Sequence, residues 1–173
     1  MRIRADFGVG HPAADVWSLL ASSQGHSCVP GLQVGQAGRG SFAFDVQARH
    51  LVFDGTAAVA SDERARTITV EARGAEQAGR GKARTTLMVK VADDGLFSTV
   101  NVEADLHLTG EIASLTRLIA EAAYRIADQV AECLEARLGT GPPRVRPAAP
   151  PPPGEPEPKT GWLRRLAGRL GGG

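Results

Sequence analysis

The stretch EIASLTRLIAEAAYRIADQVAECLEARL (residues 111–138) decides the fold. Its apolar side chains recur at three- and four-residue steps, and they are Ile112, Leu115, Ile119, Ala122, Ile126, Val130, Cys133 and Leu134. One apolar stripe on an otherwise polar helix is typical of a helix that packs one face against a core. Gly139 follows and is a common helix-ending residue. The stretch therefore predicts one long helix that covers another layer.

The two segments before this helix predict that the other layer is a sheet. Residues 82–91 and 99–108 alternate between polar and apolar side chains and are separated by Asp94-Gly95, a hairpin-turn pair. One face carries Ala83, Thr85, Leu87, Val89, Val91, Val100, Val102, Ala104, Leu106 and Leu108. A sheet with one apolar and one polar face is antiparallel and covered on one side.

The residues further upstream extend the same pattern. Alternation over residues 2–9, 42–48, 51–59 and 68–72 predicts further strands, and HPAADVWSLLAS (residues 11–22) predicts a short helix with Pro12 in its first turn. We therefore expect an α+β helix-grip fold over residues 1–138. In it, a curved antiparallel sheet of about six or seven strands wraps around the long C-terminal helix.

The side chains that face inward are numerous but small. Alanine, valine, glycine and leucine dominate, and the helix adds Ala113, Ala122, Ala123 and Ala127. Either the phenylalanines and leucines fill the interior, or an apolar ligand cavity remains. The candidate wall residues are Phe7, Trp17, Pro30, Phe44, Phe53, Val70, Leu87, Val89, Val102, Leu106, Leu115, Ile119 and Ile126.

No catalytic or metal-binding pattern emerges. His26 and Cys28 are neighbours beside a turn, but a nucleophile needs a hydrogen-bonded base, and a metal site needs further ligands. Phosphate-binding and dinucleotide-binding glycine motifs are also missing. None of the inward positions predicted here carries an ionisable side chain, and we expect no catalytic activity.

Cysteine usage and the N-terminus indicate a cytoplasmic protein. Cys28 and Cys133 form no recognisable disulfide framework, so we expect two unpaired thiols in a reducing cytosol. The first residues lack the apolar core of a signal peptide, and no stretch reaches 18 apolar residues.

The last 35 residues differ from the rest in composition. Residues 139–158 hold nine of the eleven prolines, which predicts a flexible, extended linker. Residues 139–173 carry six lysines and arginines against two glutamates, a net +4 that leaves −3 for residues 1–138. A mildly acidic domain argues against nucleic-acid binding.

Residues 159–173 predict a short amphipathic helix. Trp162, Leu163, Leu166 and Leu170 fall on one side, and Arg164, Arg165 and Arg169 on the other, with Lys159 before them. An apolar face with a tryptophan and a cationic face is typical of a helix that binds reversibly at a membrane surface. Docking in a groove of a protein partner, or an inert solubilising end, are the alternatives.

Several segments together resemble the CoxG family of carbon monoxide dehydrogenase subunits, which belongs to the START-like (SRPBCC) superfamily. They are DFGVGHPAADVWSLLAS, CVPG at residues 28–31, FDGTAAVASDE, GKARTTLMVKV and LTGEIASLTRLI, in collinear order over about residues 3–138. The resemblance places Cys28, Val29, Pro30 and Gly31 near the mouth of a cavity. One departure is ARHLVFDG, where many members carry Gly-Pro.

The resemblance implies a non-catalytic helix-grip protein that accompanies a molybdenum carbon monoxide dehydrogenase or a related hydroxylase. We therefore expect a peripheral protein on the inner leaflet of the cytoplasmic membrane. It would bind a quinone of the menaquinone or ubiquinone type, or a lipid, and no covalent cofactor. The alternatives are a recruitment module without a ligand and a START-like enzyme acting on a small hydrophobic substrate.

Overall fold

A computed structural model describes residues 1–139 of the 173-residue chain. The strands are β1 (Arg2–Val9), β2 (Leu32–Val34), β3 (Arg39–Val46), β4 (Arg49–Asp62), β5 (Thr67–Glu76), β6 (Gly81–Asp93) and β7 (Ser98–Gly110). The helices are α1 (Ala13–Leu20), α2 (Ser23–His26) and α3 (Thr116–Leu138), with 3-10 turns η1 (Gln36–Gly38) and η2 (Glu111–Leu115).

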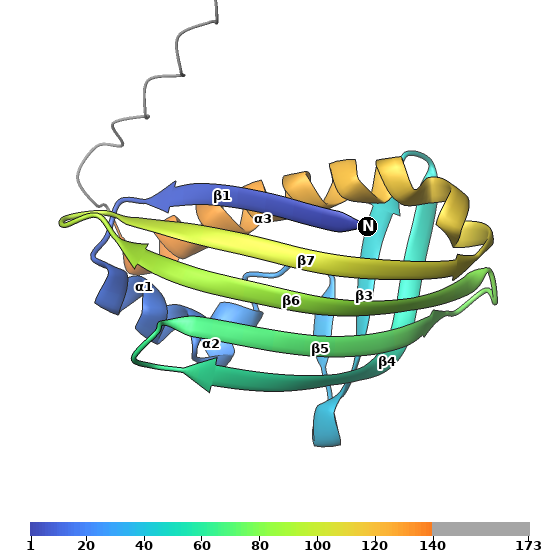
Figure 1. Cartoon of the computed structure of the whole chain (residues 1–173), viewed down its shortest axis with the longest axis horizontal. Helices are drawn as coiled ribbons and strands as arrows, with labels where there is room; N and C mark the ends of the chain where they lie inside the picture. Colours follow the sequence, from blue (N-terminus) through green and yellow to red (C-terminus); the bar gives the residue numbers. More distant parts are fainter. Residues whose placement is uncertain (140–173) are drawn as a thin grey trace, which may run out of the picture.

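The seven strands form one antiparallel sheet in the order β1-β7-β6-β5-β4-β3-β2. Figure 1 shows α3 running behind β1 along the length of the sheet. Its main sheet contacts are with β1 and β3, which lie toward opposite edges of the sheet. The sheet therefore curls around the long helix, and the predicted helix-grip fold is confirmed.

A row of glycines marks the place where the sheet bends. Gly40 of β3 pairs with Gly55 of β4, and Gly55 pairs with Gly74 of β5. In Figure 1, β3 and the first part of β4 run across the direction of β5, β6 and β7. A Cβ atom on Gly55 would clash with the carbonyl oxygen of Arg73, so the backbones approach too closely here for any side chain. We call Gly40, Gly55 and Gly74 the glycine corner.

The core consists of two clusters on the inner face of the sheet. The first joins α1 to the sheet through Val16, Trp17, Val91 and Val100 and includes Leu134 of α3. The second joins α3 to the sheet through Leu51, Phe53, Ile112, Ile119 and Ala122. The rings of Phe44 and Phe53 stack in this second cluster, with centroids 6.0 Å apart.

The structure adds short elements and shifts one boundary relative to the sequence prediction. α2 and β2 were not predicted, because segments of four and three residues show no hydrophobic period. The predicted long helix begins at Thr116 instead of residue 111. The preceding turn is η2, in which the Ile112 amide donates to the Arg80 carbonyl oxygen over 3.3 Å.

The expectation of two unpaired thiols is wrong. Cys28, which follows α2, forms a disulfide with Cys133 near the C-terminal end of α3, and their Cα atoms are 5.5 Å apart. The two cysteines are separated by 105 residues, so their spacing along the chain offers no hint of the pairing. The disulfide joins the CVPG loop to α3.

The predicted linker and amphipathic tail lie outside the described residues, apart from Gly139. Gly139 ends α3 with a φ of 90°, and its amide donates to the Glu135 carbonyl oxygen over 3.1 Å. Within residues 1–139, none of the helices combines the length and apolar character needed to cross a membrane.

Candidate functional site

The inner face of the sheet carries an apolar surface that is packed at one edge and open at the other. The pairing register aligns one inward residue from each of five strands in a row: Ile3, Ala104, Leu87, Val70 and Val59. Ile3 is 8% exposed, Leu87 and Val70 are half-buried, and Val59 is 57% exposed. Burial thus declines from β1 toward β4.

The adjacent row shows the same trend. Leu106, Thr85 and Ala72 are half-buried, and Ala57 on β4 is exposed. Beyond Thr56, β4 no longer pairs with β3, so this part of the inner face loses its neighbouring strand. We define the inner apolar strip as Ala57, Val59, Val70, Ala72 and Leu87. An apolar surface that is neither fully packed nor fully exposed is suited to an apolar ligand.

The predicted wall residues divide between the two core clusters and the space between them. Phe7, Trp17, Val89 and Val102 belong to the first cluster, and Phe44, Phe53, Leu106, Leu115 and Ile119 to the second. Pro30, Val70, Leu87 and Ile126 are half-buried and belong to neither cluster. The structure therefore brings together two groups of the predicted residues and leaves a third, less packed group. Ligand binding by any of them stays a prediction.

The CVPG loop is held on two sides. The Cys28 disulfide ties it to α3, and the Ala43 amide of β3 donates to the Gly31 carbonyl oxygen over 3.0 Å. Gly31 has a φ of 74°, and a Cβ atom there would meet the Ala43 carbonyl oxygen. Position 31 therefore requires glycine, both because of its positive φ angle and because a side chain would clash with β3.

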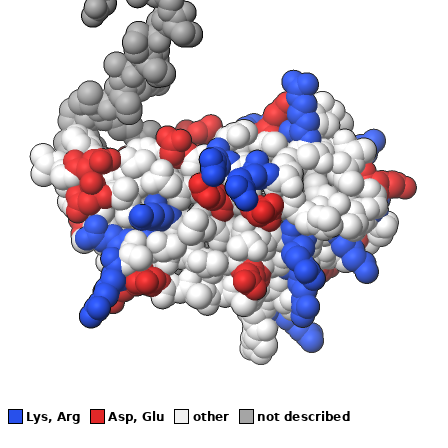
Figure 2. Space-filling model, in the orientation of Figure 1, with Lys and Arg blue, Asp and Glu red and all other residues white. Residues whose placement is uncertain are grey.

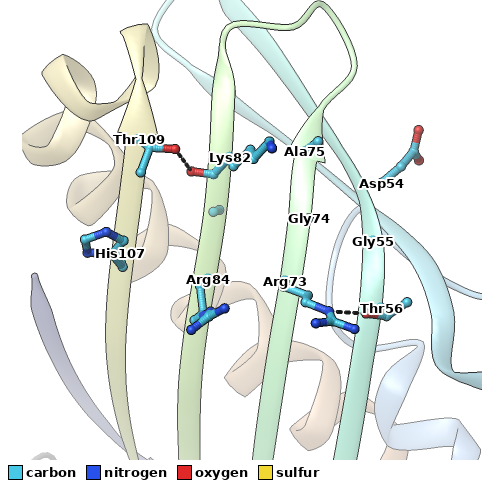
Figure 3. Close-up of a pocket in the computed structure, with 11 residues that line it drawn as sticks. Asp54, Gly55, Thr56, Arg73, Gly74, Ala75, Lys82, Arg84, His107 and Thr109 are labelled. Atoms are coloured by element: carbon cyan, nitrogen blue, oxygen red, sulfur yellow. Dashed lines mark hydrogen bonds between the residues drawn. The ribbon is translucent and has the colours of Figure 1, made fainter.

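Two hollows lie away from most of the predicted wall. A small one of about 210 Å³ lies between β1 and α3, and Phe7 is the only predicted wall residue that lines either hollow. The larger is an open groove of about 800 Å³ on the outer face of β4–β7 (Figure 3). Its lining is Asp54, Gly55, Thr56, Arg73, Gly74, Ala75, Lys82, Ala83, Arg84, His107 and Thr109. We call it the outer groove.

Glu76 is an inward-facing ionisable side chain at a position that the sequence prediction did not include. This residue ends β5 opposite Phe53 and is 4% exposed. Its carboxylate accepts hydrogen bonds from the Arg80 guanidinium over 2.7 Å and from the Arg80 amide over 3.1 Å. Arg80 also donates to the His50 carbonyl oxygen over 3.4 Å. The pair therefore joins the β5–β6 turn to the start of β4, which is a structural role.

The Glu76–Arg80 pair makes the stability of the fold depend on pH. Hydrogen bonds from Arg80 lower the pKa of Glu76 from 4.5 to about 2, although burial opposes the shift. A depressed pKa stabilises the folded state above the unfolded pKa, and this stabilisation is lost as pH falls from about 4.5 to about 2. We expect Glu76→Gln to be less stable than wild type at pH 7 and to approach it at low pH.

Urea midpoints at pH 7, 4 and 2.5 measure this difference. Glu121→Gln is the matched control, because Glu121 forms an exposed pair with Arg117 over 3.3 Å, which contributes little. A Glu76→Gln variant that stayed equally far below wild type at every pH would contradict the assignment.

Among residues 1–139, no group of three or more histidines, cysteines, aspartates and glutamates is arranged to hold a metal ion. His26 is exposed and its neighbour Cys28 is in the disulfide, so the two form no nucleophile–base pair. Sequence reasoning missed Glu76 because the predicted strand ended at residue 72, two inward positions before it.

The fold resembles several solved structures. A conserved protein from Geobacillus kaustophilus matches with a TM-score of 0.68 and 12% identity, over 80% of this chain and 95% of that one. The ZhuI aromatase/cyclase from Streptomyces sp. R1128 matches with a TM-score of 0.58 and 12% identity, over 79% and 92%. A START superfamily protein from Mycobacterium smegmatis matches with a TM-score of 0.52 and 12% identity, over 79% and 95%.

At these identities the likeness concerns the fold alone. No curated protein is a significant match to the sequence. The family model for CoxG, a subunit of carbon monoxide dehydrogenase, matches residues 6–139, which is nearly the whole described part of the chain. The chain therefore belongs to the CoxG family of carbon monoxide dehydrogenase subunits.

Proposed function

We propose that this chain is a non-catalytic accessory protein that binds an apolar molecule on the inner face of its sheet. The observation that carries the proposal is the inner apolar strip, which lies between two packed clusters and is open toward β4. Its members Val70 and Leu87 face the helix side of the sheet yet remain half-buried. A prenylated quinone of the menaquinone or ubiquinone type, or a lipid, has the apolar character that such a surface accepts.

Family membership supports the rest of the proposal. A CoxG protein is expected to act with a molybdenum carbon monoxide dehydrogenase or a related hydroxylase. We propose that it recruits this enzyme to the inner face of the cytoplasmic membrane and links it to the quinone pool. The basic amphipathic segment 159–173 supports membrane binding by its sequence pattern.

The absence of catalysis is likewise a proposal. The two inward rows described above carry one polar side chain, Thr85, and the buried Glu76 is already paired with Arg80. A hydrolytic or cyclising site needs a base with a free lone pair near the ligand. The described inner face offers no such group next to the strip.

The first test is mass spectrometry of an organic extract of the full chain purified from a quinone-containing bacterium. We expect a prenylated quinone or lipid in stoichiometric amount. An empty extract, from protein that still binds liposomes, would contradict ligand binding and favour the alternative of a recruitment module without a ligand.

A substitution within the strip tests its location. Leu87→Trp enlarges a half-buried side chain on the inner face, and we expect ligand occupancy to fall about tenfold because overpacking costs about 1–3 kcal/mol. Thr86→Trp is the control, since Thr86 is the next residue on the same strand and is exposed on the outer face. Equal occupancy in both variants, with both folded by circular dichroism, would place the ligand elsewhere.

A further inference from the structure

The outer face of the sheet is uncovered in the described part of the chain. α1 and α3 pack on the inner face, where α1 contributes Val16 and Trp17 and α3 contributes Ile119 to the core. On the other face, Arg73, Lys82 and Arg84 are all exposed. Figure 2 views this side and shows lysine and arginine side chains in a band on its right-hand half.

The outer groove concentrates positive charge in a domain that is acidic as a whole. Arg73 lies directly opposite Arg84, and Arg84 lies directly opposite His107 in the register. Lys82 lies two residues from Arg84 on the same face, and Figure 3 shows these side chains projecting from neighbouring strands. Like charges directly opposite each other destabilise a sheet, so folding alone does not account for this arrangement.

These cations lack acidic partners among residues 1–139. The Arg73 guanidinium donates to the Thr56 hydroxyl over 3.3 Å, which leaves its charge uncompensated. Lys82 and Arg84 form no ion pair within 4.0 Å in the described structure. The one carboxylate that lines the outer groove, Asp54, accepts a hydrogen bond from the Gln77 amide over 2.8 Å. With three cations against this one carboxylate, the outer groove presents a net positive charge to solvent.

The side chains beside the outer groove include several uncharged ones, with Glu71, Glu103 and Asp105 among them on the same face. Ala58, Ala60, Thr86 and Met88 project from the same face and are exposed, with Met88 at 41%. Methionine and arginine are enriched at protein interfaces, and the small side chains of Ala58 and Ala60 permit close approach of another protein. This surface and the outer groove together have the character of a protein-docking site.

The charges on the outer face indicate which of three candidates binds the outer groove: the chain's own C-terminal segment, a lipid surface or a protein partner. The chain's own segment 139–173 carries a net charge of +4, so a cationic groove repels it. An anionic lipid surface would cover the whole face and meet Glu71, Glu103 and Asp105 as well, whereas the carboxylates of a protein partner can be confined to the outer groove. This face also lacks the tryptophan and tyrosine side chains that favour a membrane interface. Carboxylates on a protein partner match the outer groove best.

We propose that the outer groove and the surface beside it form the docking site for a protein partner whose acidic patch lies over the groove, with Arg73, Lys82 and Arg84 as the charged anchor. The proposal rests on the proposed function in one respect, because the partner it names is the carbon monoxide dehydrogenase. Docking on the outer face leaves the inner apolar strip accessible to its ligand. Partner docking and ligand binding therefore use opposite faces of one sheet.

The test compares charge reversals at two places on the outer face. The full chain and its Arg73→Glu/Arg84→Glu variant are titrated against the purified dehydrogenase of the same organism by surface plasmon resonance. We expect the variant to bind about 10–100-fold more weakly, mainly through slower association, and the wild-type interaction to weaken steeply with salt. Lys90→Glu is the control, because Lys90 is an exposed outer-face residue of β6 at the far end from Lys82 and Arg84.

The possible results distinguish the proposal that the outer groove is the docking site from the proposal that the dehydrogenase is the partner. Wild-type binding that the double reversal leaves unchanged overturns the docking site but not the partner. No binding by the wild-type chain overturns the partner itself, and the docking site with it. Vesicles of phosphatidylcholine with about one-third phosphatidylglycerol form the second arm. Loss of vesicle binding by the double reversal, with dehydrogenase binding intact, overturns the proposal in favour of a membrane-facing surface.

Discussion

Replacing Gly55 by alanine destabilises the fold by about 3 kcal/mol, the upper end of the usual cost of overpacking, because the clash is with backbone atoms that cannot rotate away. The added Cβ atom would clash with the Arg73 carbonyl oxygen and would lie 2.7 Å from the Gly74 Cα atom. Both are backbone atoms of a paired strand, so relief requires β4 and β5 to separate at the glycine corner. Urea denaturation followed by tryptophan fluorescence measures the change.

Gly8→Ala is the matched control for this prediction. Gly8 also lies in a strand, β1, but a Cβ atom there would meet nothing within 4 Å. Since glycine in a strand costs roughly 0.5–1 kcal/mol relative to alanine, this variant should be as stable as wild type or slightly more so. Equal stability of the two variants would show that the strands at Gly55 separate at little cost, contrary to the close approach seen here.

Reducing the Cys28–Cys133 disulfide lowers the free energy of unfolding by about 2–5 kcal/mol. The bond closes a loop of 105 residues, which restricts the unfolded chain, and it fixes the CVPG loop to the C-terminal part of α3. Cys28 is also 4% exposed and packs with Trp17 and Leu134 in the first cluster. Urea midpoints of the oxidised protein with and without dithiothreitol give the effect.

The Cys28→Ala/Cys133→Ala variant is the control, because its stability should not respond to dithiothreitol. Alkylation of the unfolded protein before and after reduction establishes whether the bond is present. Two cysteines that alkylate without reduction would contradict the pairing. Identical midpoints for oxidised and reduced wild type would show that packing alone holds the loop on α3.

The sequence alone predicted the architecture because its signals are local. The alternation of Lys82, Ala83, Arg84 and Thr85 assigns a face to each side chain of β6 without knowledge of its neighbours. The spacing of Ile119, Ala122 and Ile126 does the same for α3. These periods predicted the sheet, its covered face and the long helix.

The remaining features depend on register and on distant pairs. Two of the hairpin turns contain Gln47 and Arg66 with positive φ angles, where residues other than glycine give no clear turn signal. The alignment of Arg73 with Arg84 depends on a different turn, the one around Gly79 between β5 and β6, and it was not predicted because the predicted strand ended at residue 72, although Lys82 and Arg84 were already assigned to the outer face. The inner apolar strip was predicted in part, through Val70 and Leu87, whereas the role of Val59 depends on where β3 stops pairing with β4.

The pairing of β1 with β7 has a consequence for synthesis on the ribosome. Arg2 pairs with Asp105 and Val9 with Ser98, so the first strand finds its partner only after about a hundred further residues have been made. At about 5–20 residues per second, Ile3, Phe7 and Val9 stay without their strand partner for roughly 5–20 s. The nascent chain therefore exposes an apolar strand near its beginning throughout the translation of the domain, and that strand is a binding site for chaperones until β7 emerges.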